Sequence, residues 1–156
     1  MTRRLLPPET MSAGLILSYQ CSAECRHCMY ACSPKWKDWI SEDDLDVLLR
    51  QIAGGIQPSP YGPRNVTLNH GLHFSGGEPF LNLDLLLKAV QLSEELRIPS
   101  TFVETNCVWC TSDEVTREKL AVLREAGMKG MRVMFPSVTS ALTCENTSFP
   151  WESLKN

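Results

Sequence analysis

The chain has 156 residues, of which 43% are apolar and 21% are charged, a composition that fits one globular domain and excludes a repeat array, a collagen-like fibre or a disordered tail. Its 15 Lys and Arg against 18 Asp and Glu give a formal charge of −3, which does not favour nucleic acid as a partner. No window reaches the roughly 20 apolar residues that cross a bilayer, and Pro7-Pro8 interrupts any signal-peptide core. We therefore expect a soluble, cytoplasmic protein without a membrane partner.

Strand and helix patterns alternate along the chain. Short apolar or β-branched runs predict four strands, at about 14–19, 72–74, 101–105 and 131–134. Leucines at helical spacing, capping sequences and terminal glycines predict three helices, at about 42–53, 81–97 and 111–127. This order predicts a parallel α/β sheet with right-handed crossovers, in which the loops at the carboxyl ends of the strands converge on one site.

Three regions follow from this pattern. We expect an N-terminal extension over residues 1–13, the α/β domain over 14–136, and an irregular C-terminal tail over 137–156. The tail is rich in Ser and Thr and holds no further strand–helix unit.

Seven cysteines are bunched along the chain: Cys21, Cys25, Cys28 and Cys32, then Cys107 and Cys110, then Cys144. An odd number so distributed is a poor disulfide framework. In a cytosolic protein it points instead to metal ligation or thiol chemistry.

The first three cysteines have the spacing C-x3-C-x2-C in a loop that leaves a predicted strand. Thiolates this close can converge on one metal centre, and soft sulfur donors are the ligands of iron–sulfur clusters. A cubane cluster has four irons, so three protein ligands leave one iron open to a small molecule.

A second motif, Gly76-Gly77-Glu78-Pro79, follows the second predicted strand. With the cysteine motif and the strand–helix order over 14–135, it resembles the radical S-adenosylmethionine (radical SAM) superfamily, which carries C-x3-C-x2-C after its first strand and GGEP after its second. The resemblance implies a partial parallel (βα) barrel. The chain offers about three and a half βα units, so the barrel is expected to be incomplete at its C-terminus.

The resemblance also implies cofactors and an activity. Cys21, Cys25 and Cys28 would hold a [4Fe-4S] cluster, SAM would chelate the fourth iron, and Gly76, Gly77, Glu78 and Pro79 would line the methionine end of SAM. The implied activity is that of an oxidoreductase that cleaves SAM reductively to a 5'-deoxyadenosyl radical, which takes hydrogen from an unknown substrate. A flavodoxin- or ferredoxin-type electron donor is implied as a partner. No catalytic residue is assigned.

Other interpretations stay open. The chain could be a truncated, inactive relative that binds a cluster, or a structural zinc module held by Cys21, Cys25, Cys28 and Cys32. Cys107 and Cys110 could form a second metal site, a redox pair or two packed thiols beside Trp109, and Cys144 has no assigned role. Thr105 and Asn106 could contact SAM or substrate, or complete a turn. An open barrel would leave the last strand as an exposed edge and favour self-association.

Overall fold

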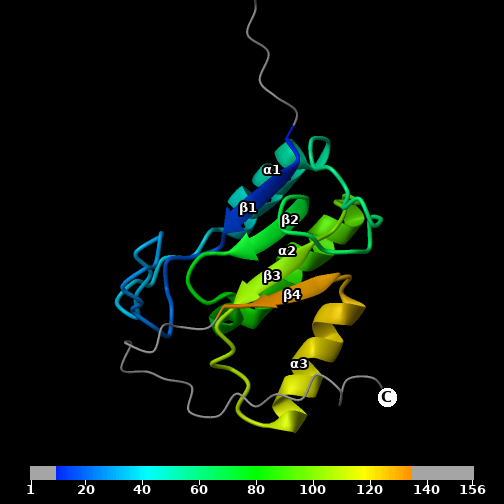
Figure 1. The fold of residues 1–156 in the computed structure, drawn as a ribbon. Coiled ribbons are helices and arrows are strands. Elements are labelled where there is room, and N and C mark those ends of the chain that lie inside the picture. The colour runs from blue at the N-terminus through cyan, green and yellow to red at the C-terminus, as the bar shows by residue number, and fades with distance from the viewer. Residues whose placement is uncertain (1–9, 135–156) are drawn as a thin grey trace, which may run out of the picture.

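Four parallel strands and three helices alternate along residues 10–134, the part of the chain that the computed structural model describes (Figure 1). The strands are β1 (Ser12–Ile16), β2 (Gly71–Ser75), β3 (Phe102–Thr105) and β4 (Gly130–Val133). The helices are α1 (Glu42–Ala53), α2 (Leu83–Glu95) and α3 (Asp113–Glu125), with a short 3-10 helix, η1 (Pro79–Asn82), before α2. The predicted α/β class and parallel sheet are confirmed.

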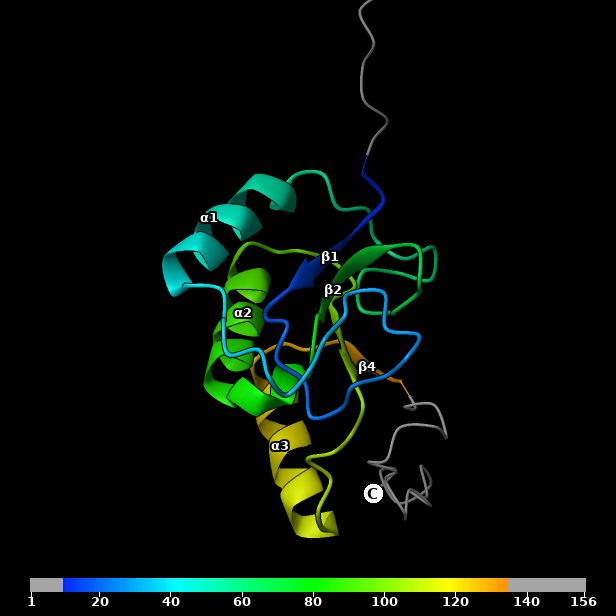
Figure 2. The same cartoon turned by 90° about the vertical axis from the view of Figure 1, so that its left-hand side faces the viewer.

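The sheet has the strand order β1-β2-β3-β4, so each helix connects two neighbouring strands. All three helices stand on one side of the sheet (Figure 2). Because the strands are parallel, their carboxyl ends lie at one edge, and the long loop that carries the cysteines leaves β1 there (Figure 1).

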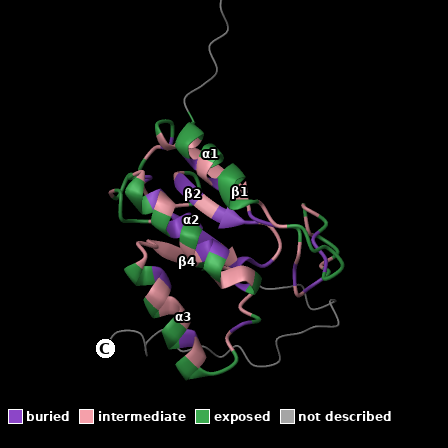
Figure 3. Cartoon of the chain, turned by 180° about the vertical axis from the view of Figure 1, so that it is seen from behind, coloured by how far each residue is buried: buried purple, intermediate pink, exposed green. Residues whose placement is uncertain are grey.

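The hydrophobic core fills the space between the sheet and its helices. Leu72 and Phe74 of β2 and Leu86 of α2 are fully buried in it, and β2 is largely buried at the centre of the domain (Figure 3). Because successive strand residues point to opposite faces, His73 and Ser75 face away from the helices. That second face of the sheet is the polar one.

Local capping explains the helix starts. The Ser41 hydroxyl accepts a hydrogen bond from Asp44 N (3.1 Å) and begins α1, and the Ser112 hydroxyl accepts one from Val115 N (3.2 Å) and begins α3. Asn82 Oδ1 accepts one from Leu85 N (3.1 Å), which begins α2 after η1. The second predicted helix is therefore divided into a 3-10 turn and an α-helix.

The boundaries of the domain differ slightly from the prediction. β1 begins at Ser12, so the last two residues assigned to the N-terminal extension belong to the sheet. The predicted tail over 137–156, with Cys144, lies outside the described residues. Within 10–134, no helix combines the length and the apolar character that a membrane crossing requires.

Candidate functional site

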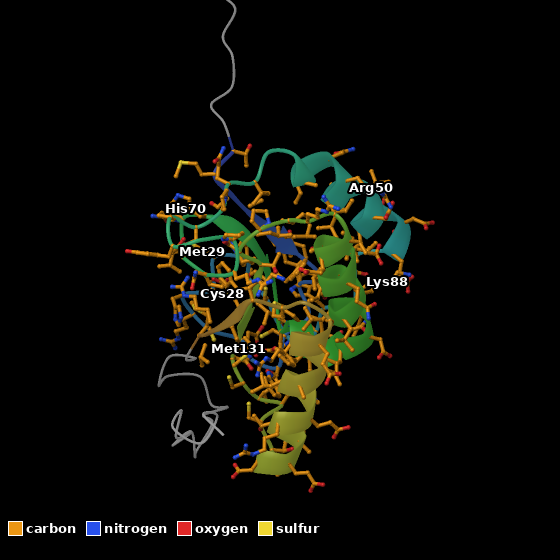
Figure 4. The ribbon with its side chains drawn as sticks, turned by 90° about the vertical axis from the view of Figure 1, so that its right-hand side faces the viewer. Cys28, Met29, Arg50, His70, Lys88 and Met131 are labelled. Carbon is orange, nitrogen blue, oxygen red and sulfur yellow. The ribbon has the colours of Figure 1, made fainter. Side chains whose placement is uncertain are left out.

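A cavity of about 610 Å³ lies at the carboxyl edge of the sheet, on the face without helices. It is lined by Cys21, Cys25 and Cys28 from the loop after β1 and by Gly76 and Gly77 from the turn after β2. Figure 4 shows Cys28 on the side of the sheet away from α1 and α2, whose Arg50 and Lys88 lie on the other side. The structure thus brings the two sequence motifs to one cavity.

Backbone hydrogen bonds join the GGEP segment to the residues just before the cysteine motif. Beyond the regular strands, Gly77 N donates to Ser18 O (2.8 Å) and Glu78 N donates to Gln20 O (2.9 Å). A Cβ on Gly77 would lie 1.7 Å from Gln20 O, and Gly76 has a φ of +120°. Only glycine fits these two positions. The resemblance predicts that these glycines line SAM, and the structure shows that Gly77 makes its close approach to the cysteine loop.

The cysteine sulfurs receive N–H donors. Cys21 Sγ accepts from Ala23 N (3.4 Å) and from Asn106 Nδ2 (3.6 Å), and Cys28 Sγ accepts from Cys32 N (3.4 Å). Burial raises the pKa of Cys21. Burial also acts to raise the pKa of Cys28, but the backbone N–H groups around its sulfur outweigh this and lower that pKa below its ordinary value. Donors of this kind stabilise a thiolate.

Cys32 is an additional member of this group. It is buried at 4% exposure and packs with Cys21, while Cys25 and Cys28 border the same small cluster. Burial and the neighbouring Cys28 raise the pKa of Cys32 to about 12, so its thiol is protonated at neutral pH. The C-x3-C-x2-C motif does not include Cys32, so its spacing did not predict that this cysteine packs with the other three.

Within residues 10–134, no three His, Cys, Asp or Glu side chains are already grouped as ligands of a single metal ion.

Glu78 lies behind the cavity wall with 1% of its surface exposed. Its carboxylate accepts hydrogen bonds from Thr105 Oγ1 (2.8 Å), Asn106 N (2.7 Å) and Phe80 N (3.2 Å). Burial raises the pKa of this carboxyl, and these hydrogen bonds oppose the shift. The carboxylate therefore holds the loop after β3 in place. Direct contact of Glu78 or of the buried Pro79 with SAM stays a prediction.

The loop after β3 is fixed by a second set of contacts. Thr105 Oγ1, which donates to Glu78, also accepts from Trp109 Nε1 (2.8 Å) and from Cys107 N (3.0 Å). The Asn106 side chain extends to the cysteine loop, where Nδ2 donates to Ser22 Oγ (2.9 Å) as well as to Cys21. Asn106 thus completes a turn, as one interpretation of the sequence expected, and also contacts the cysteine motif.

The floor of the cavity is a polar row that the sequence analysis did not identify. Ser75 Oγ donates to Glu104 Oε2 (2.7 Å), and Arg132 Nη1 donates to Glu104 Oε1 (3.1 Å). His73 stacks on Phe102, and its buried Nδ1 has no hydrogen-bond partner among the described residues. Burial lowers the pKa of His73, so the ring is neutral at neutral pH. Because strand residues alternate between faces, the position of His73 between Leu72 and Phe74 could have predicted that it faces away from the core.

The second cysteine pair is not part of the cavity wall. Cys107, with a φ of +61°, begins a turn in which its carbonyl accepts from Cys110 N (3.0 Å), and Cys110 packs against the main core. Trp109, at 6% exposure, stacks on Phe80 with ring centroids 3.9 Å apart. These contacts favour packed thiols, and the redox-pair and second-metal interpretations stay predictions.

Comparison of the chain with protein-family models gives no match, and no curated protein matches it. The resemblance to the radical SAM superfamily therefore stays a prediction from the two sequence motifs and the strand–helix order.

Proposed function

We propose that this chain is a radical SAM enzyme, or the cluster-binding part of one, with Cys21, Cys25 and Cys28 holding a [4Fe-4S] cluster and SAM at its open iron. One observation carries the proposal: the cysteine loop and the Gly76-Gly77 turn, 55 or so residues apart, are hydrogen-bonded to each other and line the same cavity. A cluster held by the cysteines, with SAM bound against the glycine turn, requires such a shared cavity.

The donor set fits such a cluster. It consists of three half-buried or buried cysteines, two of whose sulfurs receive N–H donors, beside a cavity whose volume lies in the range of small-molecule sites. When bound, the cluster and SAM would supply one-electron cleavage of the sulfonium carbon–sulfur bond, with the electron coming from a flavodoxin- or ferredoxin-type donor. The chain itself ligates, orients and shields that chemistry.

The substrate would lie over the polar floor of the cavity. Glu104 and Arg132 present an acceptor and donors there, and the apolar face of Phe102 borders them. These side chains can orient a small polar group next to the cysteine loop.

Anaerobic reconstitution with iron and sulfide tests the proposal. The wild-type chain should take up about four iron and four sulfide per molecule. Alanine at Cys21, Cys25 or Cys28 should abolish that uptake, whereas Cys32→Ala, the matched control in the same loop, should keep it. After reduction with dithionite in the presence of SAM, the wild type should release 5'-deoxyadenosine.

Two other outcomes identify the alternatives. Iron and sulfide without the nucleoside would indicate an inactive, cluster-binding relative. The burial of Cys32 against the other cysteines favours the zinc module as a second candidate. That module predicts bound zinc without sulfide, and loss of zinc in Cys32→Ala as well as in the other three variants.

A further inference from the structure

Asn106 connects the three parts of the site. Its backbone N donates to Glu78 of the GGEP segment (2.7 Å), and its side chain contacts Cys21 and Ser22 of the cysteine loop. Among the described residues, this is the one hydrogen bond to Cys21 Sγ that comes from outside the cysteine loop. The contact spans 85 residues of sequence, so it exists only in the folded domain.

The orientation of the Asn106 carboxamide is determined by its surroundings. Oδ1 accepts a hydrogen bond from Val108 N (3.0 Å), and a backbone N–H can only be paired with the oxygen of the amide. The Nδ2 group must then point the other way, where its hydrogens reach Ser22 Oγ (2.9 Å) and Cys21 Sγ (3.6 Å). The sulfur therefore faces a donor and not an acceptor.

The position of the carboxamide is also rigid. Glu78, which accepts from Asn106 N, is buried and is held in turn by Thr105 and Phe80. Thr105 and Trp109 tie the same loop to the core. Asn106 therefore presents its N–H to Cys21 from a fixed support.

We infer that Asn106 is a positioning residue that sets the reduction potential of the cluster through its N–H···S hydrogen bond to Cys21. The inference rests on the proposed function. A hydrogen bond to a ligating sulfur stabilises the added negative charge of the reduced cluster, and hydrogen bonds of this kind are among the determinants of cluster potential. Removing the donor should make the cluster harder to reduce.

Two substitutions separate this role from a structural one. Asn106→Ala removes the donor. Asn106→Asp keeps the size and the oxygen that accepts from Val108 N, but puts a negative charge beside Cys21. The matched control is Asn65→Asp, the same change at an exposed site in the loop between α1 and β2, where the Asn65 side chain donates a hydrogen bond to the Tyr61 carbonyl.

The measurement is an anaerobic redox titration followed by electron paramagnetic resonance, at pH 8, where an introduced aspartate is ionised. Iron and sulfide per chain are measured alongside. We expect the midpoint potential of Asn106→Ala to shift to more negative values, that of Asn106→Asp to shift further in the same direction, and that of Asn65→Asp to equal the wild type.

Several results would overturn the inference. Unchanged midpoint potentials in both Asn106 variants would overturn the inference and leave the proposed function standing. This holds even if cluster occupancy fell, because a purely structural residue changes occupancy without changing the potential. Equal shifts in Asn106→Asp and Asn65→Asp would also do so. A wild-type chain that takes up no iron and sulfide would overturn the proposed function and this inference together.

Discussion

At the scale of single residues, Glu78 concentrates three hydrogen bonds on one buried carboxylate. We expect Glu78→Ala to lower the free energy of unfolding by about 3 kcal/mol or more, because each buried donor left unpaired costs about 1–3 kcal/mol. Glu78→Gln keeps the shape and one acceptor oxygen, so its loss should be smaller. Urea denaturation of the cluster-free protein measures both. Glu118→Ala, at an exposed site in α3, is the control and should change stability by less than about 0.5 kcal/mol. Equal losses in Glu78→Ala and Glu118→Ala would contradict the prediction.

The same residue shows what sequence can and cannot provide at this scale. The motif predicted that Glu78 belongs to the site, but its partners Thr105 and Asn106 lie 27 and 28 residues further along the chain. Only the folded domain brings such distant residues together, so spacing within a motif could not reveal them. Residue alternation, a local property, could have indicated His73 as part of the polar face. The burial of Cys32 depends on the path of the whole loop and had no local signal.

At the scale of elements, the turn after β2 continues the parallel pairing of β1 and β2 into the site. Gly77→Ala would place a Cβ against the backbone of Gln20 and Cys21, and backbone atoms cannot move aside as a side chain can. We expect this variant to lose at least about 2 kcal/mol of stability and to take up less iron on reconstitution. Circular dichroism during thermal unfolding and iron analysis measure the two effects.

Gly54→Ala is the matched control for that substitution. Gly54 has a φ of −76°, and a Cβ there would meet nothing within 4 Å. Its stability should stay within about 1 kcal/mol of the wild type, and its iron uptake should be unchanged. If Gly77→Ala behaved like Gly54→Ala, the proposed tight junction between the two loops would be wrong.

The bounds of the elements were predicted best where residues next to the ends mark them in the sequence. The bounds of α1 agree with the prediction because Ser41 and Gly54 mark its ends in the sequence. α2 ends earlier than predicted, because Arg97 after it takes a left-handed φ of +57°. No glycine marks that position in the sequence, so the end had no local signal. β1 begins earlier than predicted because its pairing with Gly71 of β2 starts at Ser12. That pairing partner lies far along the chain and has no local signal.

At the scale of the whole molecule, the parallel sheet followed from the alternation of strand and helix patterns, because parallel strands need crossover connections that helices supply. The convergence of both motifs at one edge followed from the same rule, since the carboxyl ends of parallel strands lie together. The rule does not specify which side chains line the cavity. Its polar floor depends on the register of β3 and β4, which places Glu104 beside Arg132.

The sheet has two edges within residues 10–134, because β1 pairs there with β2 alone and β4 with β3 alone. An unpaired parallel edge offers backbone groups to another chain, and exposed methionines adjoin both edges, with Met11 at 49% and Met134 at 44% exposure. We expect the protein to self-associate, with a mass that grows with concentration in light scattering. Met134→Lys should weaken this association because a charged edge resists pairing, whereas Tyr61→Lys, at an exposed site in the loop between α1 and β2, should not. A monodisperse monomer at every concentration would contradict the prediction.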